Sequence, residues 1–138
     1  MTPNPYQRYL AATTETATPL DLVLMLYQGV LRFTGQAIQA VERHDVGEAH
    51  KSLVRAQDVI AELATSLNPE AGGTTAGSLL ALYDYSYRQL VDANVRKDPA
   101  PAEEVARLFR ELLPAWQEIA DKQRQQLVGD RVLAGVEG

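Results

Sequence analysis

The segment that decides the fold opens with Thr18-Pro19-Leu20-Asp21 and continues as an amphipathic sequence to about Arg43. Thr18 has a side chain suited to a helix N-cap, Pro19 fits the first helical position, and Asp21 stands where the acid of a capping box belongs. The apolar residues that follow recur at helical spacing rather than in the alternation of a strand. One face of this predicted helix carries Leu20, Val23, Leu24, Tyr27, Leu31, Thr34, Ile38 and Val41.

Similar signals predict a second and a third helix. Asp45 caps the second, with Glu48 three residues later. Its predicted inward face is Ala49, Leu53, Ala56, Ile60, Leu63 and Leu67. The breaker-rich stretch 68–73 predicts a loop, and the third helix then starts at Thr74 or Thr75. Its predicted inward face is Leu79, Leu80, Tyr83, Tyr87, Leu90, Val91 and Asn94.

A fourth helix follows the sequence Asp98-Pro99-Ala100-Pro101, with Glu103 and Glu104 in a favourable acidic first turn. Pro114 falls inside it, removes a backbone donor and predicts a kink there or a restart near Trp116. The predicted inward face of this helix is Val105, Leu108, Phe109, Leu112, Trp116 and Ile119.

Short connections make consecutive helices antiparallel neighbours, so the predicted fold is all-α, an antiparallel up-down-up-down four-helix bundle. The predicted bundle occupies residues 18–127. Residues 1–17 are predicted to form an extended or short-helical N-terminal covering segment, and the Gly-rich residues 128–138 a flexible C-terminal tail.

Composition narrows the function. The 138 residues suit one domain, and a net charge of -5 argues against nucleic-acid or anionic-membrane binding. The sequence has no cysteine, which removes disulfides and thiolate chemistry and fits a reducing compartment. Because the N-terminus has no signal peptide pattern and no apolar stretch of the sequence is long enough to span a bilayer, we expect a cytoplasmic protein without membrane insertion.

Groups for catalysis are scarce. His44 and His50 are the only histidines, and no Glu-x-x-His, His-Glu-x-x-His, P-loop or nucleophile-elbow motif occurs. The sequence therefore predicts no catalytic residue, no metal site, no cofactor and no enzymatic activity.

The informative feature is an excess of apolar residues over one buried stripe per helix. Leu22, Leu26 and Phe33 fall outside the first stripe, with Met25 nearby, and Leu82 and Tyr85 lie away from the stripe of the third helix. Ser78, Gln89 and Ala93 share the side of Leu82 and Tyr85. Such a face indicates an interface. Three occupants fit it: a segment of another protein, the chain's own residues 6–10, or a second copy of the chain.

Several stretches resemble the family of the flagellar secretion chaperone FliS. They occur in the family's order over residues 6–120. The matching stretches are Tyr6-Gln7-Arg8-Tyr9, Thr18-Pro19-Leu20-Asp21-Leu22, Leu26-Tyr27-Gln28-Gly29-Val30-Leu31-Arg32-Phe33, Arg55-Ala56-Gln57-Asp58-Val59-Ile60-Ala61-Glu62-Leu63, Ser66-Leu67-Asn68, Gly72-Gly73, Leu82-Tyr83-Asp84-Tyr85, Ala93-Asn94 and Ala115-Trp116.

The resemblance implies a four-helix bundle that binds the C-terminal segment of newly made flagellin, prevents premature polymerisation and supports delivery to the flagellar type III export apparatus. It also implies the export-gate protein as a partner of the chaperone–client complex, and an N-terminal segment that covers part of the client surface. The predicted contacts are Tyr6, Gln7, Tyr9, Leu10, Asn68, Leu79, Leu82, Tyr85, Gln89 and Asn94. The alternative is a generic helical-bundle adaptor or homodimeric scaffold, and a weak homodimer is compatible with either function.

Overall fold

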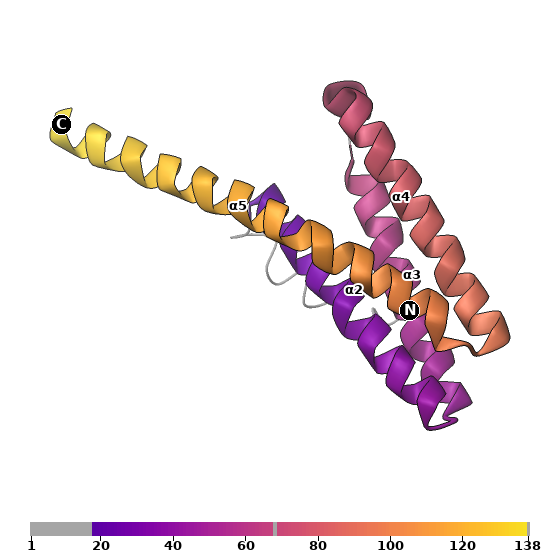
Figure 1. Cartoon of the computed structure of the whole chain (residues 1–138). Coiled ribbons are helices and arrows are strands. Elements are labelled where there is room, and N and C mark those ends of the chain that lie inside the picture. The colour runs from indigo at the N-terminus through magenta and orange to yellow at the C-terminus, as the bar shows by residue number, and fades with distance from the viewer. Residues whose placement is uncertain (1–17, 68, 138) are drawn as a thin grey trace, which may run out of the picture. The chain divides into compact units, whose positions relative to one another are not determined.

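A computed structural model of the chain describes residues 18–67 and 69–137. Over these residues it contains no strand and four helices: α2 (Pro19–Glu42), α3 (Val46–Ser66), α4 (Pro69–Arg96) and α5 (Pro99–Glu137) (Figure 1). This confirms the predicted all-α, four-helix bundle. The predicted covering segment, residues 1–17, and Asn68 lie outside the described residues.

Contacts divide the chain into two compact units. The bundle unit is Met25–Glu111, and the end unit combines the chain up to Leu24 with Leu112–Gly138. The boundaries predicted from the sequence remain predictions. The helix α5 nevertheless continues through residues 128–137, beyond the predicted end of the bundle at residue 127.

The predicted start of α2 is confirmed in atomic detail. The backbone N–H of Asp21 donates to Thr18 Oγ1 at 3.1 Å, and the N–H of Thr18 donates to Asp21 Oδ2 at 3.3 Å. Arg124 on α5 then donates to Asp21 Oδ1 at 2.9 Å within the end unit. This bond first, and the bond from the Thr18 backbone second, hold the pKa of Asp21 below its usual range.

In the connection between α2 and α3, Asp45 takes part in both helix ends. His44 has a φ of 61°, and the N–H groups of His44 and Asp45 donate to the carbonyls of Val41 and Ala40. This is the Schellman end of a helix, with a residue other than glycine in the left-handed position. The Asp45 side chain then accepts from the N–H of Glu48 at 3.1 Å, so the predicted cap of α3 is confirmed.

The connection between α4 and α5 repeats this arrangement. Lys97 has a φ of 50°, and the N–H of Asp98 donates to the carbonyl of Ala93. Asp98 Oδ1 accepts from the N–H of Ala100 at 3.0 Å and starts α5. Each of these two aspartates therefore closes one helix and caps the next.

The start of α4 differs from the prediction. Helical backbone begins at Pro69, so the predicted loop is wrong for residues 69–72. The predicted break in the helix does occur at Gly73. Gly73 has φ 58° and ψ −134°, a conformation that only glycine adopts readily, and it separates a first helical turn from the long helix beyond. Thr74 is the first residue of that long helix, as one of the two predicted starts placed it.

An aromatic cluster occupies the centre of the bundle unit. Tyr27 and Tyr83 are buried and their hydroxyl oxygens lie 2.6 Å apart, while the Phe109 ring lies 5.0 Å and 6.0 Å from theirs between centroids. Burial, reinforced by the bond to Tyr27, raises the pKa of Tyr83 far above its ordinary value. Leu53, Ala56, Ile60 and Leu63 confirm the predicted inward face of α3.

The inward faces of α2 and α4 are shifted from the predicted ones, whereas α5 buries the predicted Val105 and Phe109 and differs at Ile119. On α2 the core contains Leu26 and Phe33, each 6% exposed, so their assignment to a second apolar stripe is wrong. On α4 the predicted inward residues Tyr87 and Val91 are 40% and 41% exposed. On α5, Ile119 is 49% exposed, and the helix runs through Pro114 without the predicted restart near Trp116. The alternative of a kink at Pro114 stays a prediction.

Candidate functional site

Helix α4 presents two different edges to its neighbours. Tyr85 and Tyr87 are two residues apart and therefore about 200° apart around the helix axis. Tyr85 faces α5, where its hydroxyl meets Glu104, whereas Tyr87 faces α3, where it lines a groove with Ala61. We name these the α5 edge and the α3 edge; both lie in the bundle unit.

The α5 edge is polar and internally bonded. The hydroxyl of Tyr85 donates to Glu104 Oε1 at 2.7 Å, and this bond raises the pKa of Tyr85. The Gln89 side chain, one turn further along, also hydrogen-bonds Tyr85. Leu82 is half-buried one turn before Tyr85. Three of the predicted contact residues therefore share this edge.

The other predicted contact residues do not join them. Leu79 is half-buried, and Asn94 lies on the opposite side of α4, with its Nδ2 2.9 Å from His50 Nδ1 on α3. Lys97 donates from Nζ to Asn94 Oδ1, so both ends of this amide are used within the bundle. Tyr6, Gln7, Tyr9, Leu10 and Asn68 lie outside the described residues. A contact role for these residues stays a prediction.

The α3 edge borders an open groove of about 360 Å³ between α3 and α4. Its lining is almost wholly apolar. Asp84 contributes the one charged side chain to the lining, and the hydroxyl of Tyr83 is already bonded to Tyr27 in the core. The lining residues are Ile60, Ala61, Ala64, Leu80, Tyr83, Asp84 and Tyr87.

Exposed apolar side chains extend this groove along the bundle. Because His50 meets Asn94 further along and Ala61 lines the groove with Asp84, the residues between them, Val54 on α3 and Val91 on α4, fall in the same strip. Val54 is 37% exposed and Val91 41%. We name the groove together with Val54 and Val91 the α3–α4 face.

The sequence prediction missed this face. Tyr87 and Val91 follow Tyr83 at helical spacing, so this spacing predicts them in the core with it. The apolar arc from Tyr83 and Leu90 to Tyr87 and Val91 is, however, wider than the stripe that one buried contact requires. This excess width of the apolar arc is the sequence feature that indicates an exposed apolar face on the helix.

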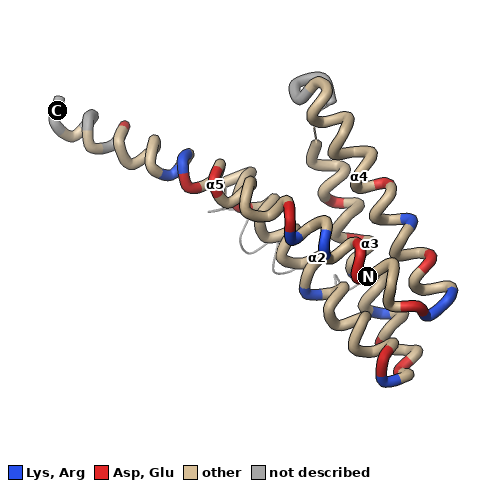
Figure 2. The backbone as a smooth tube through the Cα atoms, viewed as in Figure 1, with Lys and Arg blue, Asp and Glu red and all other residues tan. Residues whose placement is uncertain are grey.

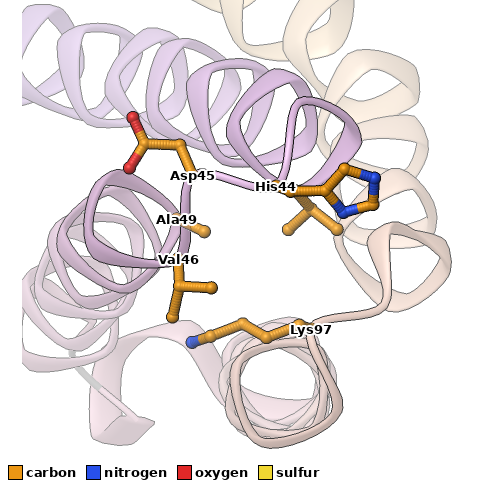
Figure 3. Close-up of a pocket in the computed structure, with 6 residues that line it drawn as sticks. His44, Asp45, Val46, Ala49 and Lys97 are labelled. Carbon is orange, nitrogen blue, oxygen red and sulfur yellow. The ribbon is translucent and has the colours of Figure 1, made fainter.

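A second, smaller cavity of about 80 Å³ lies where the two connections meet, lined by Val41, His44, Asp45, Val46, Ala49 and Lys97 (Figure 3). Figure 3 shows the Lys97 side chain extending towards Val46 across the opening. Its Nζ is bonded to Asn94, and the space is far smaller than a helical segment needs. We therefore assign the larger α3–α4 face as the candidate site.

Charged side chains and potential metal ligands are dispersed over the described helices. Among the described residues, no group of three or more histidine, aspartate or glutamate side chains is placed to hold a metal ion. Figure 2 shows basic and acidic positions interspersed along the described helices rather than gathered into a basic stripe. None of the described helices is long and apolar enough to cross a membrane.

These features define a class: a helical bundle with an open apolar groove between two of its helices. The family model described as Flagellar protein FliS matches residues 2–123, and the chain belongs to this family. FliS is a family of chaperones, not of enzymes.

Three relatives illustrate the match. The chain is 37% identical over 131 residues to the flagellar secretion chaperone FliS of Bacillus subtilis, covering 95% of this chain and 97% of the relative. It is 34% identical over 111 residues to the flagellar secretion chaperone FliSB of Pseudomonas aeruginosa, covering 80% and 88%. It is 35% identical over 108 residues to FliS of Salmonella typhimurium, covering 78% and 80%.

Proposed function

We propose that this protein is a cytoplasmic export chaperone that binds the C-terminal segment of flagellin, prevents its premature polymerisation and supports its delivery to the flagellar type III export apparatus. The observation that carries the proposal is the α3–α4 face, an open apolar groove continued by Val54 and Val91. Membership of a flagellar secretion chaperone family supplies the class of client.

The mechanism we propose is folding of a client segment on the α3–α4 face. Tyr87, Val91 and Val54 are about 40% exposed, so covering each yields on the order of 1 kcal/mol. A micromolar complex needs about 8 kcal/mol, so the client must add apolar surface of its own and also offset its ordering cost. An amphipathic segment that becomes helical in the groove meets this requirement.

Further contacts belong to the same proposal. A client segment that extends beyond the groove is proposed to make secondary contacts with Leu79, Leu82, Tyr85, Gln89, Asn94 and Asn68. The N-terminal segment is proposed to cover the client-binding surface until the client arrives, through Tyr6, Gln7, Tyr9 and Leu10. The export-gate protein is proposed as the partner that receives the chaperone–client complex.

Calorimetric titration of the purified full chain with a peptide of the flagellin C-terminal segment tests the proposal. We expect micromolar or tighter binding to one site, a negative heat-capacity change from apolar burial, and no binding of a peptide with the same composition in scrambled order. Absence of binding at tens of micromolar peptide contradicts the client assignment. Light scattering in the same buffer that shows a tight dimer without peptide affinity identifies an adaptor or scaffold instead.

A further inference from the structure

Two arginines converge on one buried ring between α2 and α3. The guanidinium carbon of Arg32 lies 5.1 Å from the centroid of the Phe33 ring, and that of Arg55 lies 5.9 Å from it. The sum of these distances, 11.0 Å, is the upper limit on the separation of the two guanidinium carbons. Phe33 is 6% exposed, so its ring is a fixed support for both cations.

These two arginines differ from most others in the chain. Among the arginines whose side chains are described, five form ion pairs with carboxylates: Arg43, Arg88, Arg96, Arg107 and Arg124. Within the same described residues, Arg32 and Arg55 form none. Asp58 stands three residues after Arg55 on α3, a spacing at which helix side chains pair, yet the Arg55 side chain turns to Phe33.

Stacking on a ring uses the flat face of a guanidinium and leaves its N–H edge available. Two like charges no more than 11.0 Å apart repel electrostatically, and a planar anion that accepts from both edges offsets that repulsion. Because the ring already limits where each arginine points, less conformational entropy is lost when the anion binds. In a chain of net charge -5, such a pair of cations is suited to a partner's acidic group.

We propose that Arg32 and Arg55 form a carboxylate clamp that binds an aspartate or glutamate side chain of the client segment and so fixes its register on the bundle. The proposal rests on the proposed function. Arg55 directly follows Val54 of the α3–α4 face, and a helix with its side chains is about 10–12 Å wide. A client in the groove therefore reaches the clamp by crossing α3 once.

The test is a double-mutant cycle between chaperone and client. Arg32→Gln and Arg55→Gln, singly and together, are titrated with the flagellin C-terminal peptide and with peptides in which each acidic residue is changed in turn to its amide. We expect the double variant to bind about 10-fold to 30-fold more weakly, and one amide-substituted peptide to lose the same factor on the wild type but nothing further on the double variant.

Arg110→Gln is the matched control, since Arg110 is exposed like Arg32 and, like both clamp arginines, forms no ion pair among the described residues, but stacks on no ring there. The affinity of this variant for the peptide should change less than 2-fold. Arg55→Lys keeps the positive charge but loses the planar guanidinium that can donate two parallel hydrogen bonds, so it should give an intermediate loss of affinity. Circular dichroism and thermal unfolding establish that each variant is folded.

Three outcomes overturn the clamp. In the first, the losses of affinity from the chaperone and peptide substitutions are additive for every acidic residue. In the second, Arg110→Gln weakens binding as much as the clamp variants do. In the third, inorganic phosphate binds in a way that depends on Arg32 and Arg55, while no peptide carboxylate shows coupling to either arginine. If the wild-type chain does not bind the peptide at all, the proposed function fails instead.

Discussion

Two tyrosines on the same helix are equally exposed and differ in what they offer a partner. Tyr85 on the α5 edge is 41% exposed and Tyr87 on the α3 edge 40%. Tyr85 holds its hydroxyl on Glu104 and lies beside Gln89, whereas Tyr87 lies beside Ala61, Ala64 and Leu80. Exposed area alone therefore does not identify an interface; the polarity of the neighbours does.

The two tyrosines also differ in what a client must displace in order to bind. An approaching client must break or work around the Tyr85–Glu104 hydrogen bond on the α5 edge. On the α3 edge it covers a surface from which water is readily displaced. We therefore expect the α3 edge to supply most of the binding energy.

The largest expected effect comes from reversing the polarity of the α3 edge. Tyr87→Asp combined with Val91→Asp places two charges where the client buries apolar surface, and we expect client affinity to fall at least 100-fold. Leu82→Asp with Tyr85→Asp is the matched change on the α5 edge and should weaken binding less than 10-fold. Calorimetric titration of both double variants with the flagellin C-terminal peptide measures the difference.

Circular dichroism at equal concentration is the control, because both variants must retain wild-type helicity. If the α5-edge variant loses affinity and the α3-edge variant does not, the assignment of the main contact surface is reversed. If the α3-edge variant unfolds, Tyr87 and Val91 belong to the core after all.

A smaller effect, on the free energy of unfolding, is expected from the buried hydrogen bond between Tyr27 and Tyr83. Tyr27→Phe leaves the Tyr83 hydroxyl buried with no other described hydrogen-bond partner, which should cost about 1–3 kcal/mol of unfolding free energy. Tyr27→Phe with Tyr83→Phe removes both hydroxyls and should cost less than the single change. Urea unfolding of the three proteins measures this, and a double variant less stable than Tyr27→Phe contradicts the role of the pair.

The smallest effect concerns Asp58, which stands between Val54 and Ala61 at helical spacing on α3. Partial desolvation of this exposed carboxyl raises its pKa, so its ionised form is disfavoured in the folded state and reduces stability at neutral pH. Asp58→Asn should therefore raise the unfolding free energy at pH 7 by less than about 0.5 kcal/mol. The gain should disappear below the unfolded-state pKa near 4, where both forms are neutral, and thermal unfolding at pH 7 and pH 3 checks this sign.

Helix boundaries were predictable because their causes are local. Thr18 with Asp21, and Asp45 with Glu48, each carry a cap within four consecutive residues, and the structure contains both. Gly73 likewise marks a break that its own backbone freedom explains. The helical turn over 69–72 was missed, since Pro69 reads as a breaker although proline is also favoured at the first position of a helix.

The rotation of each helix was less predictable. On α2, Leu31 and Phe33 both lie on apolar arcs, and tertiary packing decides that Phe33 is buried while Leu31 is half-buried. On α4 the same ambiguity concealed Tyr87. A sequence reports how much of a helix is apolar, whereas the choice of which arc faces which neighbour is made by packing.

Asp45 and Asp98 have one more consequence, for how the fold tolerates length changes. Since each ends one helix and begins the next, neither connection contains a spare residue. One inserted residue must either break a cap or turn the following helix by about 100°. Such a turn of α3 would rotate Ala61 and Ala64 away from α4 and dismantle the groove wall. Grafted sequences, tags and permuted termini should accordingly be accepted near Gly73 and rejected at these two connections.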